Sequence, residues 1–191
     1  MTLEHNRRFH DVPLAKADLQ RHIWMQIQRA AFDKFHEWHT PALATVDSQG
    51  APQARTMVLR QVDVMARQLV FFADKRSANV AQVQAQPKAC LLFWSTRLKW
   101  QLRVQVNISV LTSGARVEAA WGDLAQSPAA ADYLSTTAPG SPVRATDAAA
   151  NEAPQLAVLV ADFIEMDWLE LAKSGHRRAH ITSNSFDWLA P

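Results

Sequence analysis

The chain is poor in the residues that mark several common functional classes. Its 191 residues include one cysteine, Cys90, which cannot form an internal disulfide, and we expect it to be a small buried hydrophobe in a reducing cytoplasm. The five glycines are scattered, so the sequence has no G-x-G-x-x-G dinucleotide motif and no phosphate-binding P-loop. No apolar run is long enough to span a bilayer, and the polar N-terminus does not resemble a signal peptide. We therefore expect a cytoplasmic protein without membrane contact.

An excess of one charge is also lacking. Lysine and arginine number 20 against 18 acidic residues, and no basic run occurs, so we do not expect a nucleic-acid partner. The histidines of His36-Glu37-Trp38-His39 are three residues apart, whereas the zinc motif H-E-x-x-H places them four apart. We interpret them as a solvated pair at a helix end, and we predict no metal site.

What the sequence does contain is a pattern of one helix followed by many strands. Apolar residues at three- and four-residue spacing predict a helix over residues 14–39. Alternating or continuous apolar runs predict strands over residues 42–46, 52–62, 68–73, 88–95, 98–106, 156–171 and 176–182. We expect a helix after Ser77, two short helices within residues 115–134 and a mobile loop over residues 136–153. The fold class is thus mainly β with flanking helices, a single domain built as a closed or partly closed barrel of six or more mostly antiparallel strands.

Three separate pieces of the sequence indicate an anion site. Arg55 and Arg60 stand in an otherwise apolar strand, where a guanidinium needs an anionic partner such as phosphate, although an edge strand with two solvated arginines is an equal alternative. A regular strand would point these two side chains to opposite faces. Arg76 and Ser77 stand at a helix start, where backbone N–H groups and the helix dipole favour an anion. Gln101, on the polar face of its strand, carries an amide that can both donate and accept.

The order and spacing of these pieces resemble the pyridoxamine 5′-phosphate oxidase family. The matching segments begin at about Pro41 and are Arg55–Arg60, Phe71–Asp74, Arg76-Ser77, Leu91–Trp94, Gln101–Val104 and the ending Asp187–Pro191. The resemblance implies a split β-barrel that binds flavin mononucleotide (FMN) at the interface of a homodimer. The residues it assigns to FMN are Arg55, Thr56, Met57, Val58, Arg60, Phe72, Ala73, Arg76, Ser77, Asn79 and Gln101. Among these, Arg55, Arg76 and Ser77 would hold the phosphate, and Gln101 would reach the flavin of the other subunit.

The sequence also departs from the family pattern. Asn79 replaces a phosphate-binding lysine, and Thr137 replaces an arginine expected between Tyr133 and Ser141. Near the end, the family has the motif R-x-H-x-R, of which we match only the first arginine, to Arg177. The candidate substrate-binding residues are Arg60, Tyr133, Ser141 and Arg177.

These observations favour an FMN-dependent oxidoreductase with an altered substrate site. Two alternatives are a true pyridoxamine 5′-phosphate oxidase and a flavin carrier or sensor without turnover. A nucleic-acid-binding barrel would need exposed aromatic residues along a basic groove, whereas the aromatic residues here fall mostly in apolar runs.

Overall fold

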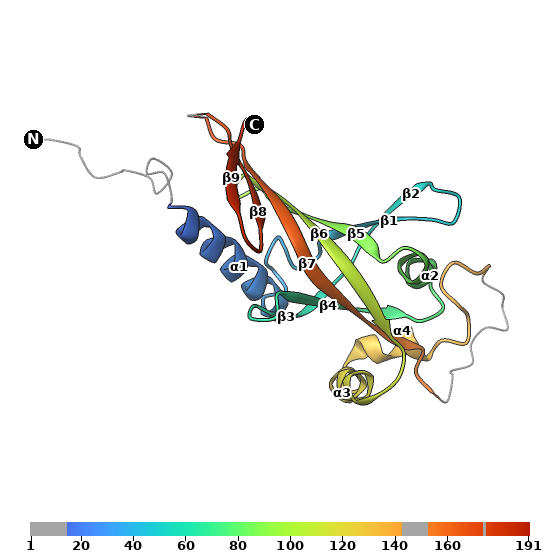
Figure 1. The fold of residues 1–191 in the computed structure, drawn as a ribbon. Helices are drawn as coiled ribbons and strands as arrows, with labels where there is room; N and C mark the ends of the chain where they lie inside the picture. Colours follow the sequence, from blue (N-terminus) through green and yellow to red (C-terminus); the bar gives the residue numbers. More distant parts are fainter. Residues whose placement is uncertain (1–14, 143–152, 174) are drawn as a thin grey trace, which may run out of the picture.

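The computed structural model describes residues 15–142, 153–173 and 175–191. It contains a curled sheet flanked by helices at its sides and at one end (Figure 1). The elements in chain order are α1 (Lys16–Phe32), β1 (Ala42–Val46), β2 (Pro52–Thr56), β3 (Leu59–Asp63), β4 (Gln68–Asp74), α2 (Ala78–Ala85), β5 (Lys88–Ser95), β6 (Trp100–Leu111), α3 (Ala115–Leu124), a 3₁₀ turn (Pro128–Ala130), α4 (Ala131–Leu134), β7 (Leu156–Glu170), β8 (Arg177–Thr182) and β9 (Phe186–Leu189). No helix in this part of the chain is long and apolar enough to cross a membrane.

The sheet has the order β2-β1-β5-β6-β7-β4-β3, with β8 and β9 added beside β7. Every strand pairing among the described residues is antiparallel. Strands β2 and β3 lie at opposite ends of this order, yet only Met57 and Val58 separate them in the chain. The sheet must therefore curl until its two edges meet, which produces a barrel that is split rather than closed by hydrogen bonds. The predicted fold class is confirmed.

One predicted strand is thus two. Residues 52–62 were expected to run as a single strand, but β2 pairs with β1 whereas β3 pairs with β4. The chain leaves the first pair after Thr56, and its backbone is then held by the carbonyls of Pro41 and His39, which accept from Met57 and Leu59. A register shift between Leu59 and Gln61 follows at once in β3.

The first helix is shorter than predicted. It ends at Phe32, because the Asp33 side chain accepts from the backbone N–H of Phe35 and turns the chain. His36 and His39 lie in the following turns and are not a solvated pair, which corrects the prediction. The His36 ring contacts Gln26 at 2.9 Å, and Nδ1 of His39 lies 2.7 Å from the carbonyl oxygen of Ala30.

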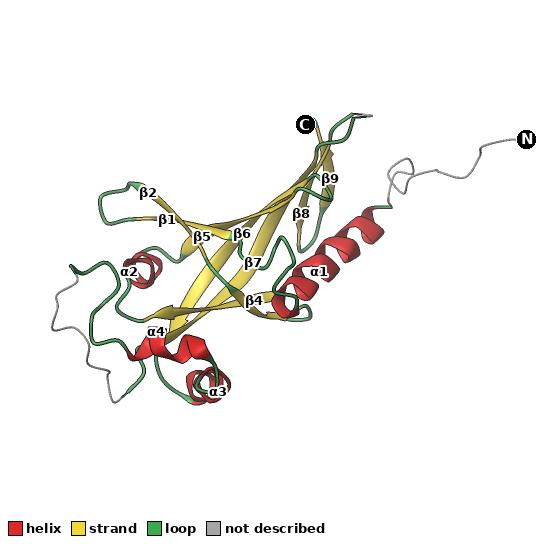
Figure 2. Ribbon diagram, turned by 180° about the vertical axis from the view of Figure 1, so that it is seen from behind, coloured by secondary structure: helices red, strands yellow, loops and turns green. Residues whose placement is uncertain are grey.

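Two apolar clusters lie on opposite sides of the sheet. The main core combines its inner face with α1 and α2 and includes Trp38, Phe93 and Trp168. The second joins alternate residues of β4 and β7 to α3 and α4, including Val158 and Tyr133. Figure 2 shows α1 at one side of the sheet and α3 with α4 together at another. The two short helices predicted within residues 115–134 are confirmed.

Cys90 is only half-buried, which corrects its predicted burial. The alternation of β5 places Ala89 and Leu91 in the core and turns Cys90 to the outer face. Strand β9 was not predicted, and most of the predicted loop over residues 136–153 lies outside the described residues.

Candidate cofactor and substrate site

Arg55 reaches from β2 toward α2 and is surrounded by neutral groups. Its guanidinium donates to the Leu43 carbonyl (3.2 Å), to the Thr45 hydroxyl and to Oε1 of Gln82 (2.8 Å). Burial lowers the pKa of Arg55 below its usual value. None of the described acidic residues forms an ion pair with it. A half-buried cation with only neutral partners is one that an added anion would stabilise.

The break between β2 and β3 faces the first turn of α2. Met57 is buried there, and the side-chain amide of Asn79 lies 3.8 Å from its sulfur. Ser77 precedes the helix and donates its hydroxyl to the Asp74 carbonyl at 2.6 Å. Arg55, Met57 and Asn79 are therefore brought to one region, between β2 and α2. Thr56, by contrast, is exposed.

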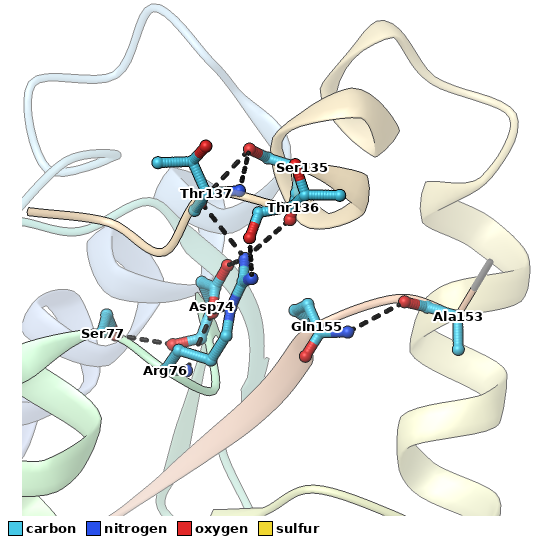
Figure 3. A network of polar contacts seen from close by, with 8 residues as sticks. All are labelled: Asp74, Arg76, Ser77, Ser135, Thr136, Thr137, Ala153 and Gln155. Carbon is cyan, nitrogen blue, oxygen red and sulfur yellow. Dashed lines mark hydrogen bonds and ion pairs between the residues drawn. The ribbon is translucent and has the colours of Figure 1, made fainter. Parts of the chain in front are cut away.

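Arg76 is engaged by the protein itself (Figure 3). Its guanidinium binds both oxygens of Asp74, with Nη2 at 2.6 Å and Nε at 3.0 Å, and Asp74 raises its pKa. The remaining donors reach the backbone carbonyls of Ser135 (2.9 Å), Thr136 (3.0 Å) and Thr137 (3.4 Å). In this conformation Arg76 fastens the end of β4 to the segment after α4.

Arg60 contacts a different set of groups from Arg55. The interruption between β2 and β3 and the register shift in β3 turn its side chain toward α4. Its guanidinium lies over the Phe72 ring, 5.5 Å from the centroid, and its Nε is buried without a described hydrogen-bond partner. It also acts on the Tyr133 hydroxyl. Burial raises the pKa of Tyr133, and the positive charge of Arg60 opposes that rise. The structure thus places Arg60, Phe72 and Tyr133 in one group.

Ser141 is not part of that group among the described contacts. It is exposed, and its backbone N–H donates to the Ala138 carbonyl at 3.1 Å. Ala73, which was also assigned to the cofactor, is buried on the opposite face of β4, in the main core.

Gln101 lies in a row of residues that crosses four strands. It stands opposite Trp94 on β5 and Leu169 on β7, and Leu169 stands opposite Arg178 on β8. We call the side of the sheet that carries this row the open face, since Leu92 and Trp94 on it remain 39% and 42% exposed. Residues opposite one another in a sheet share a face, so Gln101 and Arg178 both belong to it.

Arg177 faces inward instead. Its Nη2 lies 2.6 Å from Oε2 of Glu170, which is 2% exposed, and its guanidinium lies over the Trp168 ring. Trp100 donates to the other oxygen of Glu170 at 3.0 Å. In this conformation Arg177 belongs to a buried network.

The next residues in β8 carry a signal that sequence reasoning missed. Arg178-Ala179-His180 also satisfies the first part of R-x-H-x-R, displaced by one residue from the earlier match to Arg177. Arg178 pairs with Asp167 at 2.7 Å, and His180 contacts Glu165 at 3.1 Å, both on the open face. Alternate residues of a strand line one face, so Arg177 shares the face of the apolar Ala179 and Ile181. This pattern could have identified Arg177 as inward-facing.

A flavin phosphate fits the residues beside α2. The guanidinium of Arg55 supplies charge without a described acidic partner, and the start of the eight-residue helix supplies backbone N–H groups. Buried Met57 offers apolar surface next to it. The arrangement lacks a metal-binding cluster within residues 15–142, 153–173 and 175–191.

The curled antiparallel sheet and these site residues define a split-barrel protein. A family model described as pyridoxamine 5′-phosphate oxidase matches residues 28–167, and the chain belongs to that family. It is 38% identical over 96 residues to a pyridoxine/pyridoxamine 5′-phosphate oxidase of Paraburkholderia phytofirmans, a match that covers 48% of this chain and 44% of the relative. A second oxidase, from Thermosynechococcus vestitus, is 39% identical over 71 residues, which cover 37% of this chain and 33% of the relative. The chain thus spans less than half the length of these curated relatives.

Solved structures share the fold over nearly the whole chain. A pyridoxamine 5′-phosphate oxidase-related, FMN binding protein from Nostoc punctiforme superposes with a TM-score of 0.71 at 23% identity, covering 94% of this chain and 100% of that one. PhzG from Burkholderia lata, in complex with tetrahydrophenazine-1-carboxylic acid, gives 0.70 at 18% identity, with 97% of each chain covered.

Proposed function

We propose that this protein is an FMN-dependent oxidoreductase whose substrate site differs from that of pyridoxamine 5′-phosphate oxidase. The observation that carries the proposal is the half-buried guanidinium of Arg55, whose described hydrogen-bond partners are all neutral. Family membership supports the same reading.

The side chains around α2 would hold the phosphate end of the cofactor. Arg55 supplies the charge-assisted contact, Gln82 and Thr45 orient its guanidinium, and Met57 supplies apolar contact. When bound, FMN accepts two electrons as hydride from a small substrate, so no acid or base side chain is obligatory. The protein contributes binding, orientation and exclusion of water.

The open face supports a homodimer. It combines the exposed apolar side chains of Leu92 and Trp94 with Gln101 and the charged residues of β8. A two-fold contact through this face would bury the apolar side chains and bring Gln101, Arg178 and His180 of one subunit toward the other. Gln101 would then contact the flavin of the partner, as the resemblance implies.

Pyridoxamine 5′-phosphate should be a poor substrate. Thr137 supplies no charge where the family has an arginine, and Arg76 is engaged by Asp74 and backbone carbonyls. A charge-assisted hydrogen bond is worth about 1.5–3 kcal/mol, and a misplacement of about 1 Å can cost a hundredfold in rate.

The test begins with the absorption spectrum of the purified protein, which should show oxidised flavin bands after addition of FMN. FMN-loaded protein is then given pyridoxamine 5′-phosphate and oxygen, and aldehyde formation is followed. We expect turnover several orders of magnitude below that of a dedicated oxidase assayed in parallel. Comparable turnover would establish the alternative, a true pyridoxamine 5′-phosphate oxidase, and absence of bound flavin would refute the proposal as a whole.

A further inference from the structure

Arg60 is a cation placed beside a buried hydroxyl and an aromatic ring. Its guanidinium lies over the Phe72 ring, and Phe72 packs against the apolar cluster that contains Tyr133. No described acidic residue forms an ion pair with Arg60. Its buried Nε has no described partner. A positive charge and a hydroxyl that converge in this way form a receptor for an anion.

The second arginine of this region cannot add its charge to the receptor. Nε and Nη2 of Arg76 bind Asp74. Nη2 also reaches the backbone carbonyls of Ser135 and Thr137, and Nη1 reaches that of Thr136. Asp74 is 8% exposed, and its Oδ2 lies 2.6 Å from Nη2 of Arg76. The carboxylate therefore neutralises the charge of the guanidinium. Figure 3 shows this guanidinium between Asp74 and the backbone of residues 135–137.

No other described cation replaces it. Thr137 is uncharged, and Asp132, adjacent to Tyr133 on the exposed side of α4, contributes a negative charge from the solvent side. Within the part of the chain that the structure describes, the receptor therefore offers one positive charge that no ion pair neutralises, that of Arg60.

One positive charge matches a monoanion better than a dianion. A carboxylate presents two oxygens in one plane, and a guanidinium can donate two parallel N–H groups to them. The single charges of the two groups then cancel. A phosphate monoester carries about two negative charges at neutral pH, and the second would be removed from water without a partner. Such uncompensated burial is strongly unfavourable.

We propose that the substrate of this site is a carboxylate, held by Arg60 and Tyr133 against Phe72, and not a phosphate ester. The inference rests on the proposed function, since it assigns the substrate class of the same FMN-dependent site.

The test compares two probes with one ring and different acidic groups, benzoate and phenyl phosphate, at pH 8. Their binding to FMN-loaded protein is measured by calorimetry, after FMN binding has been measured on the same samples. We expect benzoate to bind about tenfold more tightly than phenyl phosphate, the factor that corresponds to about 1.4 kcal/mol. Failure to bind FMN would refute the proposed function. Protein that binds FMN but prefers phenyl phosphate, binds both equally or binds neither would overturn only the inference made here.

Variants locate the effect. Thr137→Arg restores a second cation and should reverse the preference in favour of phenyl phosphate, whereas Thr40→Arg, at an exposed position before β1, adds the same charge elsewhere and should not.

Arg60→Gln should lower benzoate affinity about tenfold or more, with Arg21→Gln on the exposed side of α1 as its control. Arg60→Lys keeps the charge but loses the planar pair of N–H donors, so its benzoate affinity should lie between those of the parent protein and Arg60→Gln. This variant keeps the prediction testable if Arg60→Gln does not fold. An unchanged preference in Thr137→Arg would overturn the charge argument.

Discussion

Nη2 of Arg55 donates to Oε1 of Gln82 over 2.8 Å, and this hydrogen bond ties β2 to α2. The same oxygen accepts from the Thr45 hydroxyl at 2.7 Å, so β1, β2 and α2 meet at a single amide. The guanidinium is thereby fixed in one orientation before any anion arrives. Such preorganisation reduces the entropy that a ligand must overcome on binding.

Removal of the Arg55 guanidinium should weaken FMN binding. We expect Arg55→Ala to cost about 2–4 kcal/mol of binding free energy if the arginine is a desolvated partner of the phosphate. Fluorescence titration of the flavin measures the change, and Arg21→Ala at the exposed surface of α1 is the control. An Arg55→Ala variant that folds and binds FMN as the parent does would place the phosphate elsewhere.

The buried pair of Arg177 and Glu170 should matter for stability. Removal of the arginine takes one cation away from a carboxylate that is 2% exposed, and loss of one partner of a buried pair costs up to about 3–5 kcal/mol. Urea unfolding of Arg177→Ala measures this. Arg29→Ala, which breaks an exposed pair with Asp33, should cost less than about 1 kcal/mol. Similar small losses in both variants would contradict the structural role of Arg177.

Glu37 should contribute to the pH dependence of stability. Its carboxylate accepts from the Ser95 hydroxyl and from backbone N–H groups of Arg97 and Thr96, and these hydrogen bonds hold its pKa below the ordinary value of 4.5 despite an opposing effect of burial. The folded-state pKa is therefore lower than the unfolded one. Glu37 stabilises the protein above about pH 4.5, and that contribution is lost as the pH falls through the lowered pKa.

The measurement is the free energy of unfolding of the parent protein and of Glu37→Gln between pH 7 and pH 3. The parent should be the more stable at pH 7, and the difference should shrink on acidification. A constant difference over this range would show that the Glu37 carboxylate has the same pKa in both states.

The open face should mediate self-association. Trp94 is 42% exposed in the isolated chain and stands opposite Gln101. Trp94→Glu places a charge in the proposed interface and should shift the dimer to monomer in sedimentation experiments, whereas Phe35→Glu, at an 86% exposed site after α1, should not. A dimer that survives Trp94→Glu unchanged would move the interface elsewhere.

Much of the fold could be predicted because its signals are local. The alternation of Trp100, Leu102, Val104 and Val106 is the burial pattern of β6, and its period of two decides the strand. The break between β2 and β3 carries no such signal. Neither glycine nor proline stands at Met57-Val58, and the strand ends there because the two segments pair with opposite edges of the sheet.

The candidate site shows the same division. The sequence indicates which residue types could hold an anion, but whether an arginine is already paired depends on residues distant in the chain. Arg76 meets the carbonyls of residues 135–137, some sixty positions later, and only the fold brings them together. In β8, Arg177 and Arg178 are neighbours, so their side chains point to opposite faces of the sheet. Ala179 and Ile181 are buried, which places Arg177 on the inner face with them.

The most direct test of the central claim is a parallel titration of the flavin-free protein with FMN and with riboflavin, which differ only in the phosphate. Because Arg55 and the start of α2 are assigned to that phosphate, FMN should bind at least about tenfold more tightly. The preference for FMN should fall in Arg55→Ala, while riboflavin affinity stays the same. Equal affinities of the parent protein for the two flavins would contradict the account.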